Sequence, residues 1–307
     1  MNNNNYNLSK NHLYDEFVGD SEVSTESVHL GTCGAEQRID DKIRSRNDFL
    51  IDSHCHIKLL NDQGKNVDDV IKNANENNVK LLINVCTRID EMPAMLDISA
   101  NHENVFCSVG QHPEEIKNEK IIIEDILRYV DNNKVVAIGE TGLDYHYNID
   151  NKANQTENFI LHIEASRQGN LPIIIHSRDA DEDMINILKS EVKNGAFNFV
   201  LHCFCSSREL AWTGLDLGGF ISFSGILTFK NSTELKSIAK AVPLDRIILE
   251  TDSPYLAPEP FRGKVNEPAN VKYVAEYLST LLDIDYETIQ DKTTTNVFSL
   301  FSKLPNN

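Results

Sequence analysis

The sequence has no long apolar run, and its first ten residues are rich in asparagine rather than in leucine or valine. A membrane-spanning helix needs about 20 mostly apolar residues, so we expect neither a transmembrane segment nor a secretory signal. The six cysteines also lack the regular close spacing of a disulfide framework. We therefore expect reduced thiols and a cytoplasmic protein, with Cys203 and Cys205 as packing residues.

Positive charge is scarce as well, because 29 Lys and Arg residues face 47 Asp and Glu residues, which gives a formal net charge of −18. A protein that holds nucleic acid through its own charge carries a basic stripe, and none is visible here. If the substrate were a phosphodiester, bound cations would have to supply much of the positive charge. Binding would then be local, at one or two nucleotides.

Residues 1–47 differ from the rest of the chain in composition. They are rich in Asn, Ser and acidic residues and show no sustained period of 2 or 3.6. We predict a disordered or loosely attached tail. The alternative is an extra packed N-terminal element, for which Leu13, Phe17 and Val18 would supply the apolar side chains.

From Phe49 onward, eight short apolar runs alternate with longer amphipathic stretches. Such alternation implies parallel strands, which are buried and therefore continuously apolar. Eight units in about 260 residues match a (β/α)8 barrel. A doubly wound open sheet is the alternative, but it would be expected to carry a glycine-rich phosphate loop, which is missing. We therefore predict an α/β protein with a (β/α)8 barrel over residues 48–307. The predicted strands are 49–53, 81–86, 105–109, 135–139, 172–175, 199–201, 220–223 and 246–249, and the predicted helices are 67–79, 121–130, 154–167, 181–192, 208–217, 232–241, 268–282 and 293–301.

Side chains able to bind metal follow six of the eight predicted strands. The carboxyl ends of the strands of a parallel barrel meet on one face, where active sites are built. Taken singly, each residue has an ordinary explanation, such as a core histidine or a turn cap. Their joint position at strand ends favours one shared site. The residues are His54, His56, His112, Glu140, His176, His202 and Asp252. The other histidines are interpreted as structural, although His146 could border the site.

Imidazole and carboxylate ligands together suit divalent ions such as Mg, Mn or Zn. The ligands are too many for one ion, so we predict two ions that share a carboxylate, with Glu140 as the bridge. Two neighbouring ions can activate a water and stabilise an in-line phosphoryl displacement. Asp252 would bind one ion and take the proton from the water, while His112 would donate a hydrogen bond to a phosphoryl oxygen.

Three further residues are predicted to contact the substrate. Arg262 lies in a loop after the eighth strand and is the predicted phosphate clamp, because a guanidinium fork matches phosphate. Lys264 and Asp144 are the other two predicted contacts. The alternative for Arg262 and Lys264 is an ordinary solvated loop.

The longer motifs resemble the TatD family of metal-dependent deoxyribonucleases over about residues 49–303. They are residues 54–56 (HCH), 110–113 (GQHP), 139–145 (GETGLDY), 172–178 (PIIIHSR), 202–204 (HCF), 221–225 (ISFSG), 249–258 (LETDSPYLAP), 262–264 (RGK) and 266–268 (NEP). Two features depart from the family pattern. The tail before Phe49 is not part of it, and Lys58 stands where an acidic or amide residue usually follows the His-x-His turn.

The resemblance implies an amidohydrolase-type barrel with two divalent ions. One ion would be held by His54, His56, Glu140 and Asp252, and the other by Glu140, His176 and His202. The implied activity is hydrolysis of DNA, often by trimming single strands from the 3′ end. The implied partner is therefore single-stranded DNA as substrate, with no membrane involved.

Two other functions stay open at the sequence level. The first is an acyl or aminoacyl-ester hydrolase on the same metal site, such as one that removes a D-amino acid from tRNA. Many acyl-cleaving relatives bridge their metals with a carboxylated lysine, whereas the fourth strand here offers Glu140 and no lysine, which favours phosphodiester cleavage. The second is a non-catalytic metal-binding protein, and the complete set of ligands argues against it.

Overall fold

The computed structural model describes residues 46–116, 121–147 and 149–305. The tail predicted over residues 1–47 therefore lies outside the described residues up to position 45. Arg46 and Asn47 are described, and both contact helix α10 (Tyr286–Leu300). The backbone N–H of Asn47 donates to the Asp291 carboxylate at 2.9 Å, and a side-chain nitrogen of Arg46 lies 3.1 Å from Asp285. Arg46 and Asn47, the first described residues, are thus hydrogen-bonded to the barrel.

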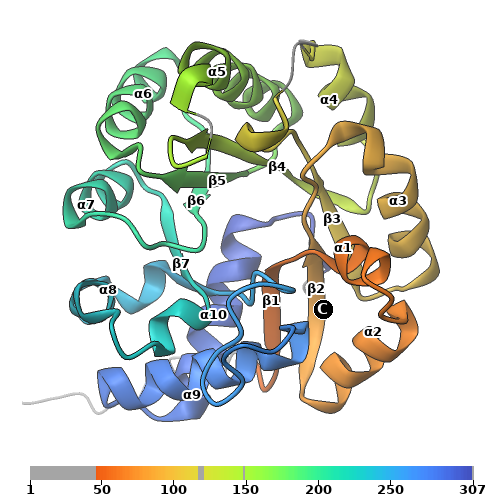
Figure 1. The fold of residues 1–307 in the computed structure, drawn as a ribbon, viewed down its shortest axis with the longest axis vertical. Helices are drawn as coiled ribbons and strands as arrows, with labels where there is room; N and C mark the ends of the chain where they lie inside the picture. The colour runs from red at the N-terminus through yellow and green to blue at the C-terminus, as the bar shows by residue number, and fades with distance from the viewer. Residues whose placement is uncertain (1–45, 117–120, 148, 306–307) are drawn as a thin grey trace, which may run out of the picture. The chain divides into compact units, whose positions relative to one another are not determined.

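Eight parallel strands form one sheet in sequence order, and helices alternate with them on the outside (Figure 1). Each strand pairs in parallel with the next one along the chain. This arrangement confirms the predicted α/β class and (β/α)8 barrel. The strands are β1 (Leu50–Cys55), β2 (Val79–Asn84), β3 (Val105–Val109), β4 (Val135–Asp144), β5 (Ile173–Arg178), β6 (Phe199–Leu201), β7 (Phe220–Phe223) and β8 (Ile247–Leu249).

The ring of strands is closed just beyond β8. Cys55 at the end of β1 forms a parallel bridge with Ser253. The backbone N–H of Asp252 donates to the His54 carbonyl at 2.9 Å, and that of His56 donates to the Ser253 carbonyl at 2.8 Å. The same hydrogen bonds that close the barrel therefore place Asp252 beside the two histidines of the first strand.

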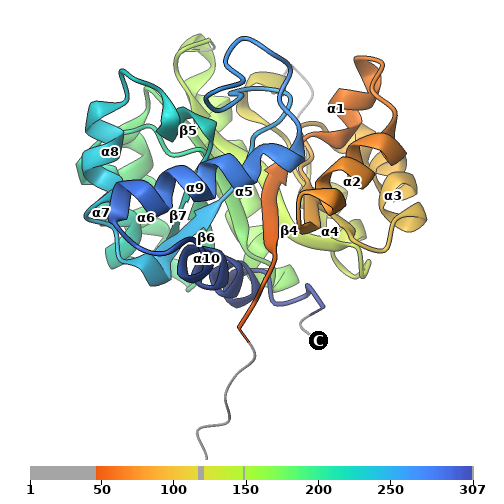
Figure 2. The same ribbon diagram turned by 90° about the horizontal axis from the view of Figure 1, so that it is seen from below.

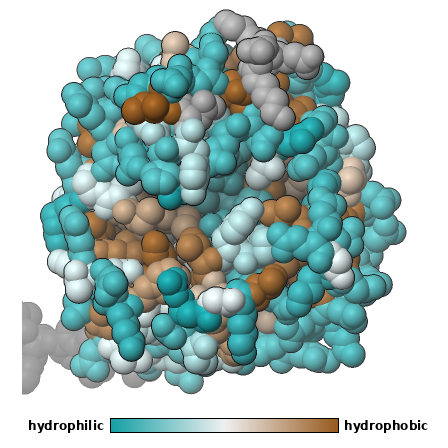
Figure 3. Space-filling view, in the orientation of Figure 1, coloured by the Kyte–Doolittle hydropathy of each residue, from teal (hydrophilic) through white to brown (hydrophobic). Residues whose placement is uncertain are grey.

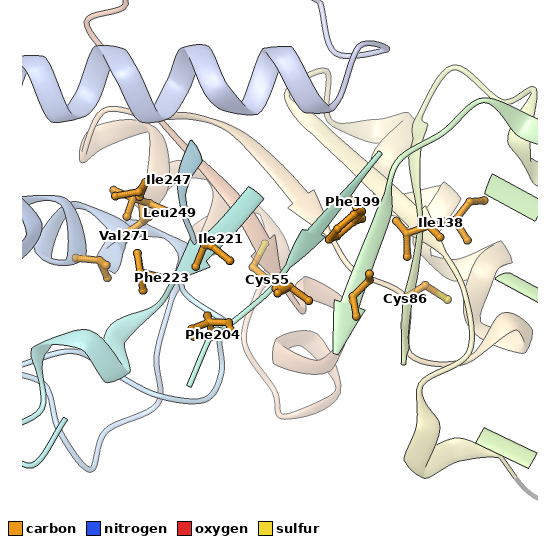
Figure 4. Close-up of a cluster of buried hydrophobic side chains, with 14 of the residues drawn as sticks. Cys55, Cys86, Ile138, Phe199, Phe204, Ile221, Phe223, Ile247, Leu249 and Val271 are labelled. Carbon is orange, nitrogen blue, oxygen red and sulfur yellow. The ribbon is translucent and has the colours of Figure 1, made fainter. Parts of the chain in front are cut away.

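The helices cover the barrel and seal one of its ends. Outward side chains of the strands pack with the helices in one cluster of buried residues, part of which is drawn around Phe199, Ile221 and Phe223 in Figure 4. A second cluster joins side chains of the strands to Leu300 and Phe301 at the end of α10. Figure 2 shows α10 across the end of the barrel opposite the loop that follows β8. Within the described part of the chain, the end at which the strands terminate is thus the one left for a site.

Most predicted helices are confirmed, but two were missed. Helix α1 has only six residues, too few to show a helical period, and α3 begins with a proline at its second position. Helix α10 starts earlier than predicted because the Asp285 side chain accepts a hydrogen bond from the Thr288 N–H at 2.7 Å and caps it. The helices other than α10 are α1 (Ile57–Asp62), α2 (Val67–Glu76), α3 (Met92–Asn101), α4 (Ile123–Val130), α5 (Lys152–Gly169), α6 (Asp181–Asn194), α7 (Arg208–Asp216), α8 (Thr233–Ala239) and α9 (Val271–Leu282).

Strand β4 is twice as long as predicted, because it continues past Gly139 to Asp144. It stays paired with β5 to the end, where Asp144 lies opposite Arg178. Gly142 makes this approach feasible: its φ is +142°, and a Cβ there would lie 2.0 Å from the His176 carbonyl oxygen. The extension keeps Glu140 and Asp144 on one strand beside His176.

None of the helices in the described ranges combines the length and the apolar character needed to cross a membrane. Figure 3 views the face onto which the barrel opens. Most of this face is hydrophilic, and hydrophobic side chains gather mainly to the left of its centre.

Candidate metal centre

The predicted ligands converge on Glu140, whose buried side chain lies at the centre of the open end of the barrel. Its two oxygen atoms face different neighbours. Oε2 lies 3.3 Å from His54 Nε2, whereas Oε1 lies 2.7 Å from His202 Nε2 and 3.0 Å from His176 Nδ1. The carboxylate therefore joins two groups of side chains, one on each of its oxygens.

The first group consists of His54, His56 and Asp252 beside Oε2 of Glu140. The Nε2 atoms of the two histidines are 3.2 Å apart, and Asp252 Oδ1 lies 3.6 and 3.4 Å from them. Four ligand atoms at about 2.1 Å from one ion in tetrahedral geometry would be separated by about 3.4 Å. The spacing of this group therefore suits a single divalent ion.

The second group lies beside Oε1 of Glu140. His176 Nδ1 and His202 Nε2 are 3.4 Å from one another, and both face this oxygen. His112 Nε2 also lies 3.4 Å from Oε1. Three imidazoles thus surround one carboxylate oxygen, and their hydrogen bonds elsewhere distinguish their roles.

Three histidines use one ring nitrogen as a donor outside the cluster. His56 Nδ1 lies 3.0 Å from the Val85 carbonyl, and His202 Nδ1 lies 3.3 Å from the Glu250 carboxylate. His176 Nε2 lies 2.9 Å from the Asp144 carboxylate. A neutral imidazole carries one N–H, and here that N–H is needed by these acceptors. In the neutral form, the other nitrogen of each ring would present its lone pair to a bound ion, as a metal ligand must.

His112 shows the opposite arrangement. The backbone N–H of Glu114 donates to His112 Nδ1 at 3.1 Å, so this nitrogen carries the lone pair. In the neutral ring Nε2 must then carry the proton, and it points at Glu140. His112 is placed to donate a hydrogen bond within the site and is unsuited to bind an ion through Nε2.

His54 faces the cluster through Nε2, which lies 3.2 Å from His56 Nε2, 3.3 Å from Glu140 Oε2 and 3.6 Å from Asp252 Oδ1. Its Nδ1, on the other side of the ring, has no hydrogen-bond partner among the described residues and would carry the ring proton when Nε2 binds an ion. The donor set and its spacing therefore fit divalent metal, which would bind the lone pairs and anionic oxygens that otherwise face one another.

Both carboxylates of the cluster are held in the ionised form. Burial alone would raise the pKa of Glu140, but the charges of His202, His112 and His54 outweigh burial and hold that pKa well below its usual value. Burial likewise opposes ionisation of Asp252, and the hydrogen bond and charge of His56 lower its pKa in spite of it. Anionic carboxylates at neutral pH are what metal binding requires.

Glu250 is a residue of the site that the sequence reasoning missed. It is buried just after β8, and its carboxylate holds the Nδ1 side of His202. Its position two residues before Asp252, at the same strand end, was the available signal. Such a carboxylate partner fixes the orientation of a metal-binding histidine.

Asp144, predicted to contact the substrate, is buried at the end of β4. Its carboxylate lies on His176 Nε2 and also accepts hydrogen bonds from the backbone N–H groups of His146 and Tyr147 at 2.9 and 3.1 Å. These contacts orient His176 in the way that Glu250 orients His202. Direct contact of Asp144 with substrate stays a prediction.

The two predicted basic contacts lie over aromatic side chains, one after β7 and the other in the loop that follows β8. The Arg262 guanidinium carbon is 3.6 Å from the centre of the Phe229 ring, and Lys264 Nζ is 5.5 Å from that of Phe261. Both basic residues are exposed. Phosphate binding by Arg262 and Lys264 stays a prediction.

The cysteines are free thiols at every described position, as predicted. Cys203 is partly buried, and its Sγ lies 3.1 Å from Ser224 Oγ. Cys205 is exposed, so its interpretation as a packing residue was wrong. The strand-end pattern does not distinguish these two positions, because both follow β6 in an irregular segment.

His162 has the structural role predicted for it. It is buried on α5, its Nδ1 contacts the Asn158 carbonyl at 2.7 Å, and its Nε2 accepts a hydrogen bond from the Gln111 N–H at 3.0 Å. Burial lowers the pKa of His162 from 6.5 to about 4. The neutral ring therefore supports the backbone next to His112.

This low pKa leads to a prediction about stability. Between pH 6.5 and pH 4 the unfolded chain binds a proton at His162 that the folded chain does not, so stability falls as the pH is lowered. The shift of His162 corresponds to about 3 kcal/mol of the free energy of unfolding. Urea unfolding measured at pH 7 and at pH 4.5 gives the decrease in the free energy of unfolding between the two pH values. This decrease is expected to be smaller in His162→Gln than in the native protein. Equal losses in both proteins would contradict the prediction.

Comparison with known proteins places this arrangement among metal-dependent hydrolases. The family model described as TatD related DNase matches residues 51–302. The chain is 46% identical over 255 residues to YcfH of Escherichia coli K12, named an uncharacterized metal-dependent hydrolase, covering 82% of this chain and 96% of that protein. It is 37% identical over 257 residues to YabD of Bacillus subtilis, which has the same description, covering 82% and 99%. The crystal structure of the Escherichia coli TatD homologue YJJV superimposes with a TM-score of 0.75 at 24% identity, covering 83% of this chain and 98% of that one, which supports the fold.

Proposed function

Since the chain belongs to the family of TatD-related DNases and is a metal-dependent hydrolase, we propose that it cuts phosphodiester bonds of single-stranded DNA with two divalent ions, trimming from the 3′ end. The observation that carries this proposal is the carboxylate of Glu140, which presents one oxygen to each of two groups of ligand atoms. A pair of ions is the arrangement suited to in-line displacement at phosphorus.

In this proposal His54, His56, Glu140 and Asp252 would hold one ion, and Glu140, His176 and His202 would hold the other. Bound ions would supply positive charge to the phosphoryl oxygens and lower the pKa of the attacking water. Mg, Mn and Zn all suit this set of ligands. The charge matters because the chain itself has a net charge of −18 and would otherwise repel a nucleic acid.

Two side chains of the cluster are assigned roles in proton transfer and charge stabilisation. Asp252 is the more accessible of the two central carboxylates, with a side chain 15% exposed against 4% for Glu140. It is therefore the group that accepts the proton of the attacking water. His112 carries its proton on Nε2 and donates it in a hydrogen bond to the charge that develops on a phosphoryl oxygen.

The test uses metal-stripped protein and a single-stranded oligonucleotide labelled at either its 3′ or its 5′ end. Addition of Mg²⁺, Mn²⁺ or Zn²⁺ is expected to restore cleavage, and successive shortening of the 5′-labelled strand would report trimming from the 3′ end. Cleavage without added metal would contradict the metal mechanism. Protein that binds two ions per chain and cuts no oligonucleotide would instead point to acyl or aminoacyl-ester substrates.

A further inference from the structure

Two tyrosines at the open end of the barrel are exposed although they lie close to the cluster of predicted metal ligands. Tyr255 follows Asp252 by three residues and is 54% exposed. Its ring centre lies 6.4 Å from that of His56, with the two planes at 71°. The backbone of Tyr255 is held by hydrogen bonds to Asp252 and Asn266, so the ring projects from a fixed position.

The second aromatic side chain is Tyr147, which is 64% exposed. Its backbone N–H donates to Asp144, the residue that orients His176. The guanidinium carbon of Arg178 lies 4.6 Å from the centre of the Tyr147 ring. Because alternate residues of a strand point to the same side, Arg178 leaves β5 on the side of His176. A planar cation and an aromatic ring thus lie against one another at the ends of β4 and β5, the strands that carry Glu140 and His176.

These two surfaces lie across the mouth of the barrel from one another. Tyr255 belongs to the seam between β8 and β1, and Tyr147 and Arg178 belong to the ends of β4 and β5, which lie on the opposite side of the ring of strands (Figure 1). The cluster around Glu140 lies between these two sides of the ring. His54 and Asp252 come from the side of β1 and β8, and His176 comes from the side of β4 and β5.

Resting on the proposed function, we propose that Tyr255 and the Tyr147–Arg178 pair bind the bases on either side of the phosphodiester that is cut. Each tyrosine would stack on one base, and the Arg178 guanidinium would also face the phosphate next to the scissile one. Stacking of a base on an aromatic ring stabilises single-stranded complexes by about 1–3 kcal/mol per base and is tolerant of sequence. The contact needs unpaired bases, so it selects single strands.

This mode of binding also suits the charge of the chain. A protein with a net charge of −18 gains little from long-range attraction to phosphates. Stacking supplies affinity without a basic groove. For a single strand, each phosphate contact contributes about −0.7 to the slope of a plot of log affinity against log salt concentration. We therefore expect a shallow salt dependence, with a slope of about −1.

The experiment compares Tyr255→Leu and Tyr147→Leu with the native protein on oligonucleotides that are intact or abasic at the terminal or penultimate position. Each leucine variant is expected to lower kcat/KM on intact substrate by roughly tenfold. On the substrate that lacks the base proposed to stack on the replaced tyrosine, kcat/KM of each variant should lie within about twofold of that of the native protein. Tyr255→Phe and Tyr147→Phe, which keep the rings, should recover most of the loss, and Arg178→Lys should lose activity because the planar group is gone.

A wholly abasic oligomer with a fluorescent label separates this inference from the proposed function. Suppose that the metal-loaded protein cuts this oligomer and that the leucine variants cut intact strands as well as the native protein does. That result would contradict the proposed stacking of bases on the two tyrosines, while the proposed nuclease activity would be supported. Equal losses on intact and abasic strands would assign the tyrosines a structural role and also overturn the inference. Absence of cleavage of every oligomer by the metal-loaded native protein would overturn the proposed function itself.

Discussion

Replacing Glu140 with glutamine is expected to lower hydrolysis by about 10³-fold or more and to reduce the metal content of the purified protein. The amide cannot present two anionic oxygens, so both groups of ligand atoms lose their shared carboxylate. Stabilisation by bound ions contributes several kcal/mol to such a transition state, and about 4 kcal/mol corresponds to a factor of 10³. The measurements are turnover of a labelled oligonucleotide and elemental analysis of the dialysed protein.

Two variants serve as controls for this result. Glu191→Gln makes the same change at another buried glutamate, which pairs with Arg167 at 3.0 Å on the outside of the barrel, and it should keep its metal and its activity. His112→Ala removes the predicted donor and should slow turnover by about 10²-fold while the metal is retained. A Glu140→Gln protein with full activity and metal content would refute the bridging role of Glu140.

Replacing Glu250 with glutamine is expected to weaken metal binding by about 10- to 100-fold. Its carboxylate accepts from His202 Nδ1 at 3.3 Å and thereby keeps Nε2 directed into the cluster, where its lone pair would bind an ion. An amide can instead donate to Nδ1, which would leave the proton on Nε2, the nitrogen that faces the cluster, and so remove the lone pair that an ion needs. Activity should therefore return when the metal concentration is raised, whereas the Glu140→Gln defect should persist.

The measurement is activity as a function of free Mn²⁺ or Zn²⁺ in metal-stripped protein. Glu267→Gln is the matched control, because Glu267 pairs with Lys65 and Asn73 at the outer edge of the barrel. An apparent metal affinity in Glu250→Gln that equals that of the control would show that Glu250 does not act through His202.

The barrel could be predicted because burial on both faces leaves a simple signal in the sequence. Each of the eight strands contains an apolar run, and parallel order follows from the helices between them. The end of β4 could not be read in this way, since residues 140–144 alternate polar, small and apolar side chains and are buried by contact with β5. Helices α1 and α3 were missed because short or proline-containing segments lack a clear helical period.

The convergence of the predicted ligands could also be foreseen, since topology alone brings strand ends to one face. The orientation of the rings could not. Whether His112 or His176 offers a lone pair depends on the partners of its other nitrogen, Glu114 in one case and Asp144 in the other. The loop after β8 was equally unpredictable, because no periodicity indicates that Arg262 lies over Phe229.

The hydrogen bonds that close the barrel have a consequence for how the protein is made. Asp52 accepts hydrogen bonds from Thr251 across 199 positions of the sequence, and Asp252 reaches the first strand through the carbonyl of His54. During translation the amino-terminal ligands leave the ribosome long before the last one. A nascent chain therefore lacks one of the proposed ligands until nearly all of the barrel has been synthesised, so the proposed metal site, and with it hydrolysis, would arise only at that stage.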